Sequence, residues 1–124
     1  MKLGFIGLGN MASAMIGGML KKGLVNSQDI IGSDVSEAGR AKAAEQFGIE
    51  ACADNKKVAA EADVLFFAVK PIFLPEVLAE IADCVKENTV MVSIVAGKSI
   101  DFIKQGMGGN QGKLFVVCPI PLPW

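Results

Sequence analysis

Two glycines and an alanine near the start of the chain have a spacing that can serve chemistry. An apolar run ends at Ile6, and the segment Gly7-Leu8-Gly9-Asn10-Met11-Ala12 then fits the pattern G-x-G-x-x-A. In this pattern the first glycine makes a tight turn, and the second lets a ligand approach the backbone because it has no Cβ. The N–H groups at the start of the following helix attract phosphate. The segment predicts binding of a dinucleotide pyrophosphate, with an ordinary glycine turn as the alternative.

An acidic residue follows the second apolar run, in the pair Ser33-Asp34. Asp34 lies 22 residues after Ala12, near the spacing expected for a residue that binds the adenosine ribose. A carboxylate there accepts hydrogen bonds from ribose hydroxyls and repels a 2′-phosphate, so the electrostatics favour NAD over NADP. The alternative is that Asp34 caps the next helix, a role that Ser36 could also fill.

Three further strand ends are expected to line the same cleft, because ligands bind at the carboxyl ends of parallel strands. Lys70 places a cation where a cofactor phosphate, a ribose or a substrate carboxylate would lie, unless it is a plain charge at a strand end. Gly97 offers backbone that a ligand can approach closely. The three segments are Val69-Lys70-Pro71, Val95-Ala96-Gly97 and Cys118-Pro119.

Strand and helix signals alternate along the chain, which is typical of a parallel sheet with helices on both faces. We expect one α/β domain of the doubly wound Rossmann type over residues 1–118, followed by a proline-rich tail over 119–124. Asn10 is expected to cap the first helix. The expected strands are 3–6, 30–33, 49–53, 64–69, 89–95 and 114–118, and the expected helices are 10–22, 36–47, 56–61, 74–85 and one that begins at 99.

Composition excludes several classes of function. The net charge of −1 gives no basic surplus for nucleic acid, and no apolar stretch is long enough to span a membrane. The sequence has no histidine and three widely spaced cysteines, so we expect buried free thiols, no metal site and no disulfide framework. Cytoplasmic enzymes fit this profile. Chemistry must then depend on a cofactor, on the backbone or on residues outside this chain.

The segments GFIGLGNMASAMIGG, ADVLFFAVKP and SIVAGKSI together resemble the N-terminal dinucleotide-binding domain of the pyrroline-5-carboxylate reductase family, over about residues 1–118. The resemblance implies hydride transfer from NADH or NADPH to the C=N bond of 1-pyrroline-5-carboxylate, which gives L-proline. It implies that residues 7–11 bind the pyrophosphate, that Asn55 contacts the adenosine ribose, and that residues 68–71 with Ala96 and Gly97 hold the nicotinamide. Asp34 stands where the family often has a small polar residue that faces the adenosine ribose or 2′-phosphate. Ile6 and Ser33, at the ends of the first two strands, are predicted to belong to the same cofactor site. It assigns no catalytic side chain, because the substrate imine can arrive protonated.

Two departures from the family pattern affect the substrate. The family's last strand leads into a motif like MPNTP, whereas this chain has Cys118-Pro119-Ile120-Pro121-Leu122. The family's C-terminal helical domain, which implies a homo-oligomer and completes the imino-acid pocket, is absent from the sequence. We therefore expect these residues alone to be inactive. A reductase of another small imine or oxo acid and a non-catalytic NAD(P)-sensing module remain as alternatives.

Overall fold

A computed structural model describes residues 1–86, 88–94 and 113–116 of the chain. Its strands form a six-stranded sheet in the order β3-β2-β1-β4-β5-β6, with every neighbouring pair parallel. This is the classical order of the doubly wound dinucleotide-binding fold, so the predicted fold class is confirmed. The strands are β1 (Leu3–Ile6), β2 (Ile30–Ser33), β3 (Glu50–Cys52), β4 (Val64–Phe67), β5 (Val90–Ser93) and β6 (Lys113–Val116).

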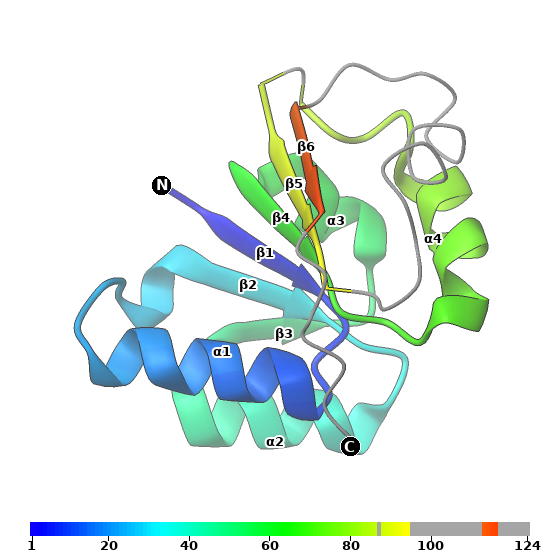
Figure 1. Ribbon diagram of the computed structural model, residues 1–124. Helices are drawn as coiled ribbons and strands as arrows, with labels where there is room; N and C mark the ends of the chain where they lie inside the picture. Colours follow the sequence, from blue (N-terminus) through cyan, green and yellow to red (C-terminus); the bar gives the residue numbers. More distant parts are fainter. Residues whose placement is uncertain (87, 95–112, 117–124) are drawn as a thin grey trace.

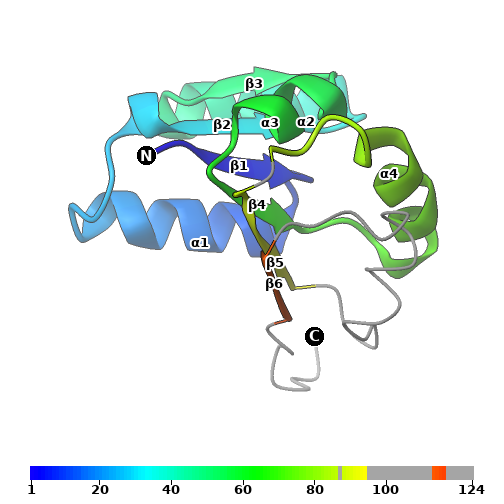
Figure 2. The same cartoon turned by 90° about the horizontal axis from the view of Figure 1, so that it is seen from above.

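Helices cover both faces of the sheet. Figure 2 shows α1 and α4 on opposite sides of β1 and β4. In the described part of the chain, α1 packs beside α2, and α3 packs beside α4 (Figure 1). The four helices are α1 (Asn10–Lys21), α2 (Glu37–Phe47), α3 (Asn55–Glu61) and α4 (Leu74–Ile81).

Alternating side chains on the central strands build two apolar cores, one on each face of the sheet. Phe5 packs with α1 and α2, and its ring stacks on that of Phe66 with the ring centres 4.5 Å apart. Ile6 and Phe67 pack against α3 and α4 on the other face. Because each central strand buries side chains on both faces, its sequence is a continuous apolar run. These two cores hold the carboxyl ends of β1, β2 and β4 next to one another.

A glycine ends each of the first two long helices. After α1, the Gly23 N–H donates to the Leu20 carbonyl (3.1 Å) and the Leu24 N–H donates to the Met19 carbonyl (3.0 Å). This pair of bonds satisfies the last helical carbonyls, and it needs the left-handed backbone that Gly23 adopts, with a φ of 69°. Gly48 ends α2 in the same conformation.

The start of α1 differs from the prediction. Asn10 is the first helical residue and not its cap, because Gly9 takes the extended cap conformation and has no side chain to accept a hydrogen bond. The first N–H groups of α1 are therefore left without a side-chain cap. This matters for ligand binding, because such groups attract anions.

Other boundaries shift by a few residues. The helix α4 ends at Ile81 and not at Val85, because the Cys84 N–H donates to the Ile81 carbonyl (2.8 Å) and tightens the chain into turns. The strand β4 ends at Phe67, two residues before the prediction, and a 3₁₀ turn over Pro71–Phe73 leads into α4.

Several predictions fall outside the described residues: the helix from 99, the domain boundary at 118 and the proline-rich tail. Cys52 and Cys84 are free thiols but only half-buried, so full burial was wrong for both, and Cys118 is not described. None of the helices over the described ranges combines the length and the apolarity needed to cross a membrane.

Candidate functional site

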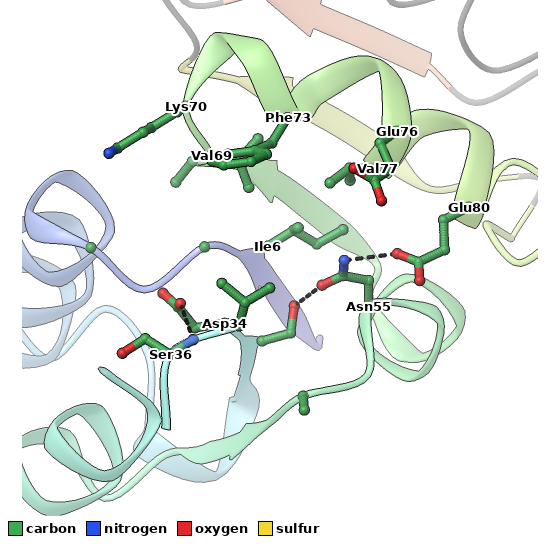
Figure 3. A pocket seen from close by; sticks show the side chains of 16 residues that line it. Ile6, Asp34, Ser36, Asn55, Val69, Lys70, Phe73, Glu76, Val77 and Glu80 are labelled. Atoms are coloured by element: carbon green, nitrogen blue, oxygen red, sulfur yellow. Dashed lines mark hydrogen bonds between the residues drawn. The ribbon is translucent and has the colours of Figure 1, made fainter. Parts of the chain in front are cut away.

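A cleft of about 550 Å³ opens at the carboxyl edge of the sheet, between the β1–α1 turn, the end of β2 and the near face of α4. Figure 3 shows it from close by. Backbone of the glycine-rich turn forms one side, and apolar and acidic side chains of α4 form the other. The lining residues are Ile6, Gly7, Gly9, Ser33, Asp34, Val35, Ser36, Ala53, Asn55, Ala68, Val69, Lys70, Phe73, Glu76, Val77 and Glu80.

Gly7 makes the turn that leads off β1 into the cleft. Its φ of +102° is a conformation that other residues rarely adopt, and a Cβ on it would lie 2.6 Å from the Ala68 carbonyl oxygen. Its N–H donates to the Ser33 carbonyl (2.8 Å), which continues the β1–β2 pairing by one residue. Only glycine satisfies both the dihedral angle and the close approach to β4.

Gly9, unlike Gly7, has no close neighbours. A Cβ built on Gly9 has no atom within 4 Å, so this glycine faces open space in the cleft. Three residues further on, Ala12 is fully buried and lets α1 pack closely on the sheet. An open glycine at the uncapped start of a 12-residue helix is a fitting cradle for pyrophosphate oxygens.

Leu8 lies between these glycines and points away from the cleft. Its side chain is only 5% exposed, and a Cβ on Gly32 would lie 2.5 Å from the Leu8 Cδ2 atom. The missing side chain at Gly32 thus makes room for Leu8, which anchors the turn against β2. Nothing in the spacing of the G-x-G-x-x-A pattern indicates this second requirement for glycine.

The carboxylate of Asp34 joins two backbone segments. Its Oδ2 accepts from the Leu8 N–H (2.8 Å), and its Oδ1 accepts from the Ser36 N–H (2.9 Å). The cap of α2 is Ser36, whose Oγ accepts from the Gly39 N–H (3.1 Å), so the interpretation of Asp34 as that cap is wrong. Asp34 lines the cleft and also holds the glycine-rich turn to the end of β2.

A chain of three side chains crosses from β2 to α4 (Figure 3). The Ser33 hydroxyl donates to Asn55 Oδ1 (2.5 Å), and Asn55 Nδ2 donates to Glu80 Oε1 (2.8 Å). Asn55 is placed by the start of α3, where the Asp54 carboxylate accepts from the Lys56 N–H (3.0 Å) and caps the helix. Three elements that are distant in the sequence therefore share one wall of the cleft.

The helix α4 supplies the wall that sequence reasoning missed. Its cleft-lining residues recur at the spacing of one helical face, which is the signal that could have identified them. Lys70, three residues after the end of β4, is exposed and reaches over the side of the cleft where α1 begins (Figure 3). Val35 is 93% exposed although it is apolar and lines the cleft. The lining residues not predicted from sequence are Val35, Ser36, Ala53, Phe73, Glu76, Val77 and Glu80.

The predicted site residues divide into three groups. Those that the structure brings together around the cleft are Ile6, Gly7, Gly9, Ser33, Asp34, Asn55, Ala68, Val69 and Lys70. Leu8, Asn10, Met11 and Pro71 adjoin this set along the chain but do not line the cleft. Ala96 and Gly97 lie outside the described residues.

Comparisons with known proteins agree with this architecture. The family model described as NADP oxidoreductase coenzyme F420-dependent matches residues 2–97. Pyrroline-5-carboxylate reductase from Escherichia coli K12 is 38% identical over 110 residues, which cover 89% of this chain and 41% of that protein.

Two solved structures are also similar. A pyrroline-5-carboxylate reductase from Coxiella burnetii superposes with a TM-score of 0.82 at 29% identity, over 86% of this chain and 40% of that one. The Plasmodium falciparum pyrroline carboxylate reductase with NADP bound gives a TM-score of 0.79 at 25% identity, over 93% and 40%. The chain therefore belongs to the family described as NADP oxidoreductase, coenzyme F420-dependent, and the resemblance of its motifs to pyrroline-5-carboxylate reductases is confirmed.

Proposed function

We propose that this chain is the dinucleotide-binding part of a pyrroline-5-carboxylate reductase, with NAD or NADP as its cofactor. One observation carries the dinucleotide part of the proposal: the glycine-rich turn presents Gly9 and the uncapped start of α1 to a cleft of about 550 Å³. The 38% identity to the Escherichia coli enzyme supports the reductase part. The chain spans 41% of the length of the Escherichia coli relative, so the activity of a whole reductase is part of the same proposal. Assembly into a homo-oligomer also belongs to it.

Each part of the cleft has a proposed role. The backbone of residues 7–11 binds the pyrophosphate, because free N–H groups and the helix dipole attract its charge. Ser33, Asp34 and Asn55 bind the adenosine ribose, since they supply polar atoms at the end of β2 and the start of α3. Residues 68–71, together with Ala96 and Gly97, hold the nicotinamide half.

The chemistry follows from the cofactor's own reactivity. When bound, a reduced nicotinamide supplies a hydride to the C=N bond of 1-pyrroline-5-carboxylate, which becomes L-proline. The chain's residues bind and orient, because a protonated imine needs no side chain to act as a strong acid. Lys70 offers an exposed cation for the substrate carboxylate or a cofactor phosphate.

One sequence observation favours a second candidate. Ile120 and Pro121 replace the polar residues of the family's MPNTP-like motif, so a related reductase of another small imine or oxo acid fits as well. A panel of cyclic imines and oxo acids, assayed with the protein as it is encoded, distinguishes the two. Preferential reduction of 1-pyrroline-5-carboxylate supports the first candidate. Binding of dinucleotide without any reduction favours a sensing module.

The test of dinucleotide binding uses two matched glycines of this chain. Neither Gly9 nor Gly18 has an atom within 4 Å of a built Cβ, but only Gly9 lines the cleft, while Gly18 lies inside α1. We expect Gly9→Val to weaken NADH and NADPH binding by about a hundredfold, because its side chain occupies the phosphate cradle. Gly18→Ala should leave both affinities unchanged. Titration followed by nicotinamide fluorescence measures the six dissociation constants, for the wild type and the two variants with each dinucleotide.

Thermal unfolding followed by circular dichroism controls for loss of structure. If the folded wild-type chain binds neither dinucleotide, the proposal is wrong. If Gly9→Val binds as tightly as Gly18→Ala, the ligand does not approach Gly9 and the proposed pyrophosphate site is wrong.

A further inference from the structure

The chain of hydrogen bonds from Ser33 through Asn55 to Glu80 has its direction set at one end. A carboxylate has only acceptor atoms, so Asn55 must present its Nδ2 group to Glu80 Oε1, as it does at 2.8 Å. Its Oδ1 then faces Ser33, and the hydroxyl must donate to that oxygen. Glu80, in the last turn of α4, thereby determines the hydrogen-bonding state of a serine at the end of β2 (Figure 3).

The consequence is a wall that offers mainly acceptors to a ligand. Ser33 is fully buried and its proton is directed at Asn55, so it offers no donor to a ligand, whereas Glu80 is exposed and has a second carboxylate oxygen that can accept. The second N–H of the Asn55 amide is the one donor that this chain of hydrogen bonds does not use. Without the carboxylate, the Asn55 amide is no longer held in this orientation, and the wall loses one acceptor and one negative charge.

We propose that Glu80 is a positioning residue that, with Asp34, makes the cleft select a dinucleotide whose adenosine ribose has a free 2′-hydroxyl. The inference rests on the proposed function and deepens it. A ribose hydroxyl can donate to these acceptors. A 2′-phosphate carries a charge of about −1.5 to −2 near neutral pH and has acceptor oxygens, so it is repelled and finds few donors. The wall therefore favours NAD over NADP by rejecting the phosphate.

Three further charged groups lie on or beside the cleft, and one of them, Arg40, is a cation close to Asp34. Glu76 lines it from the same face of α4 and adds a further carboxylate. Lys70 also lines the cleft, but it reaches toward the start of α1 and not toward Asn55 (Figure 3). Arg40 donates from Nη1 to the backbone carbonyl of Asp34 (2.8 Å) and is not among the lining residues.

The experiment compares NADH and NADPH affinities in four versions of the 124-residue chain. We expect the wild type to bind NADH about tenfold more tightly than NADPH, because the nearby carboxylates repel the 2′-phosphate. The difference stays modest because salt partly screens this repulsion. Glu80→Gln keeps the shape but can donate, and Glu80→Ala removes the carboxylate, so each should lower that ratio by about threefold or more. Glu45→Gln, an exposed glutamate on α2, is the matched control and should keep the wild-type ratio.

The ratio of the NADH and NADPH affinities distinguishes a change in cofactor selectivity from a loss of structure, because partial unfolding lowers both apparent affinities by the same factor. A wild type that binds NADPH as tightly as NADH overturns the proposed preference and leaves dinucleotide binding standing. An unchanged ratio in both Glu80 variants overturns the role of Glu80. A folded chain that binds neither ligand overturns the proposed function and this inference together.

Discussion

The two edges of the parallel sheet use their polar groups in opposite ways. At the amino edge, Asp63 accepts from the Lys2 N–H (2.7 Å) and from Lys86 Nζ (2.6 Å), and the buried Thr89 hydroxyl donates to the Ala62 carbonyl (3.2 Å). These bonds tie together the segments that enter β1, β4 and β5. At the carboxyl edge, the segments that leave the strands separate around a cleft.

The carboxylates at the two edges have different kinds of hydrogen-bond partner. Lys86 holds the pKa of Asp63 below its ordinary value through a hydrogen bond, and the Lys2 N–H lowers it further. Asp34 at the carboxyl edge instead accepts from two backbone N–H groups, and Glu80 accepts from an amide. One edge pairs its charge with a lysine on the protein, and the other keeps carboxylates along a ligand-sized space.

The largest effect that can test this division comes from Gly7→Ala. The substitution forces a Cβ to within 2.6 Å of the Ala68 carbonyl oxygen at a φ of +102°. We expect a loss of about 3 kcal/mol or more in the free energy of unfolding, because backbone strain and overpacking add. Urea unfolding measures it.

Gly9→Ala is the matched control from the same turn. The φ of −77° at Gly9 suits any residue and a Cβ there has open space, so only the cost of alanine at an N-cap remains. The free energy of unfolding should fall by about 1 kcal/mol at most. Equal destabilisation by the two substitutions would contradict the assignment of Gly7 to the fold and Gly9 to the ligand.

The features that sequence predicted well are those that depend on local patterns. The strand bounds of β1 and β2 follow from short apolar runs, and the turn at Gly7 follows from the glycine spacing. The partners of Asp34 could not be predicted, because Leu8 is 26 residues away and becomes a neighbour only when β1 and β2 pair. Spacing alone predicts a carboxylate near the ribose without showing that it also holds the turn.

The α4 wall was missed for a related reason. Helical spacing places Glu76 and Glu80 on one face of α4, but that face meets the cleft only because Leu74 and Leu78 pack against the sheet. Tertiary packing, which no local pattern contains, decides which helix faces the ligand.

A smaller effect is expected from Asp34→Ala, which removes the acceptor of the Leu8 and Ser36 N–H groups. We expect a loss of about 1–2 kcal/mol in the free energy of unfolding, since both groups are only partly shielded from water. Dinucleotide affinity should fall as well, because Leu8 belongs to the phosphate-binding turn. Asp83→Asn, a change at an exposed residue outside the cleft, serves as the control. A destabilised variant with undiminished affinity would show that the turn keeps its shape without Asp34.

The smallest effect is expected from Asp63→Asn at the amino edge. Since the folded pKa of Asp63 lies below its unfolded value of about 3.9, its stabilising contribution is present above that value and is lost as the pH falls through the folded pKa. The variant should therefore unfold more easily than the wild type at pH 7, and the gap should close below about pH 4. Urea unfolding at several pH values measures the gap, which stays modest because the Asp63–Lys86 pair is about half exposed. NADH affinity at pH 7 should not change, because Asp63 lies at the opposite edge from the cleft. A fall in that affinity would show that the two edges are coupled, and the division between them would fail.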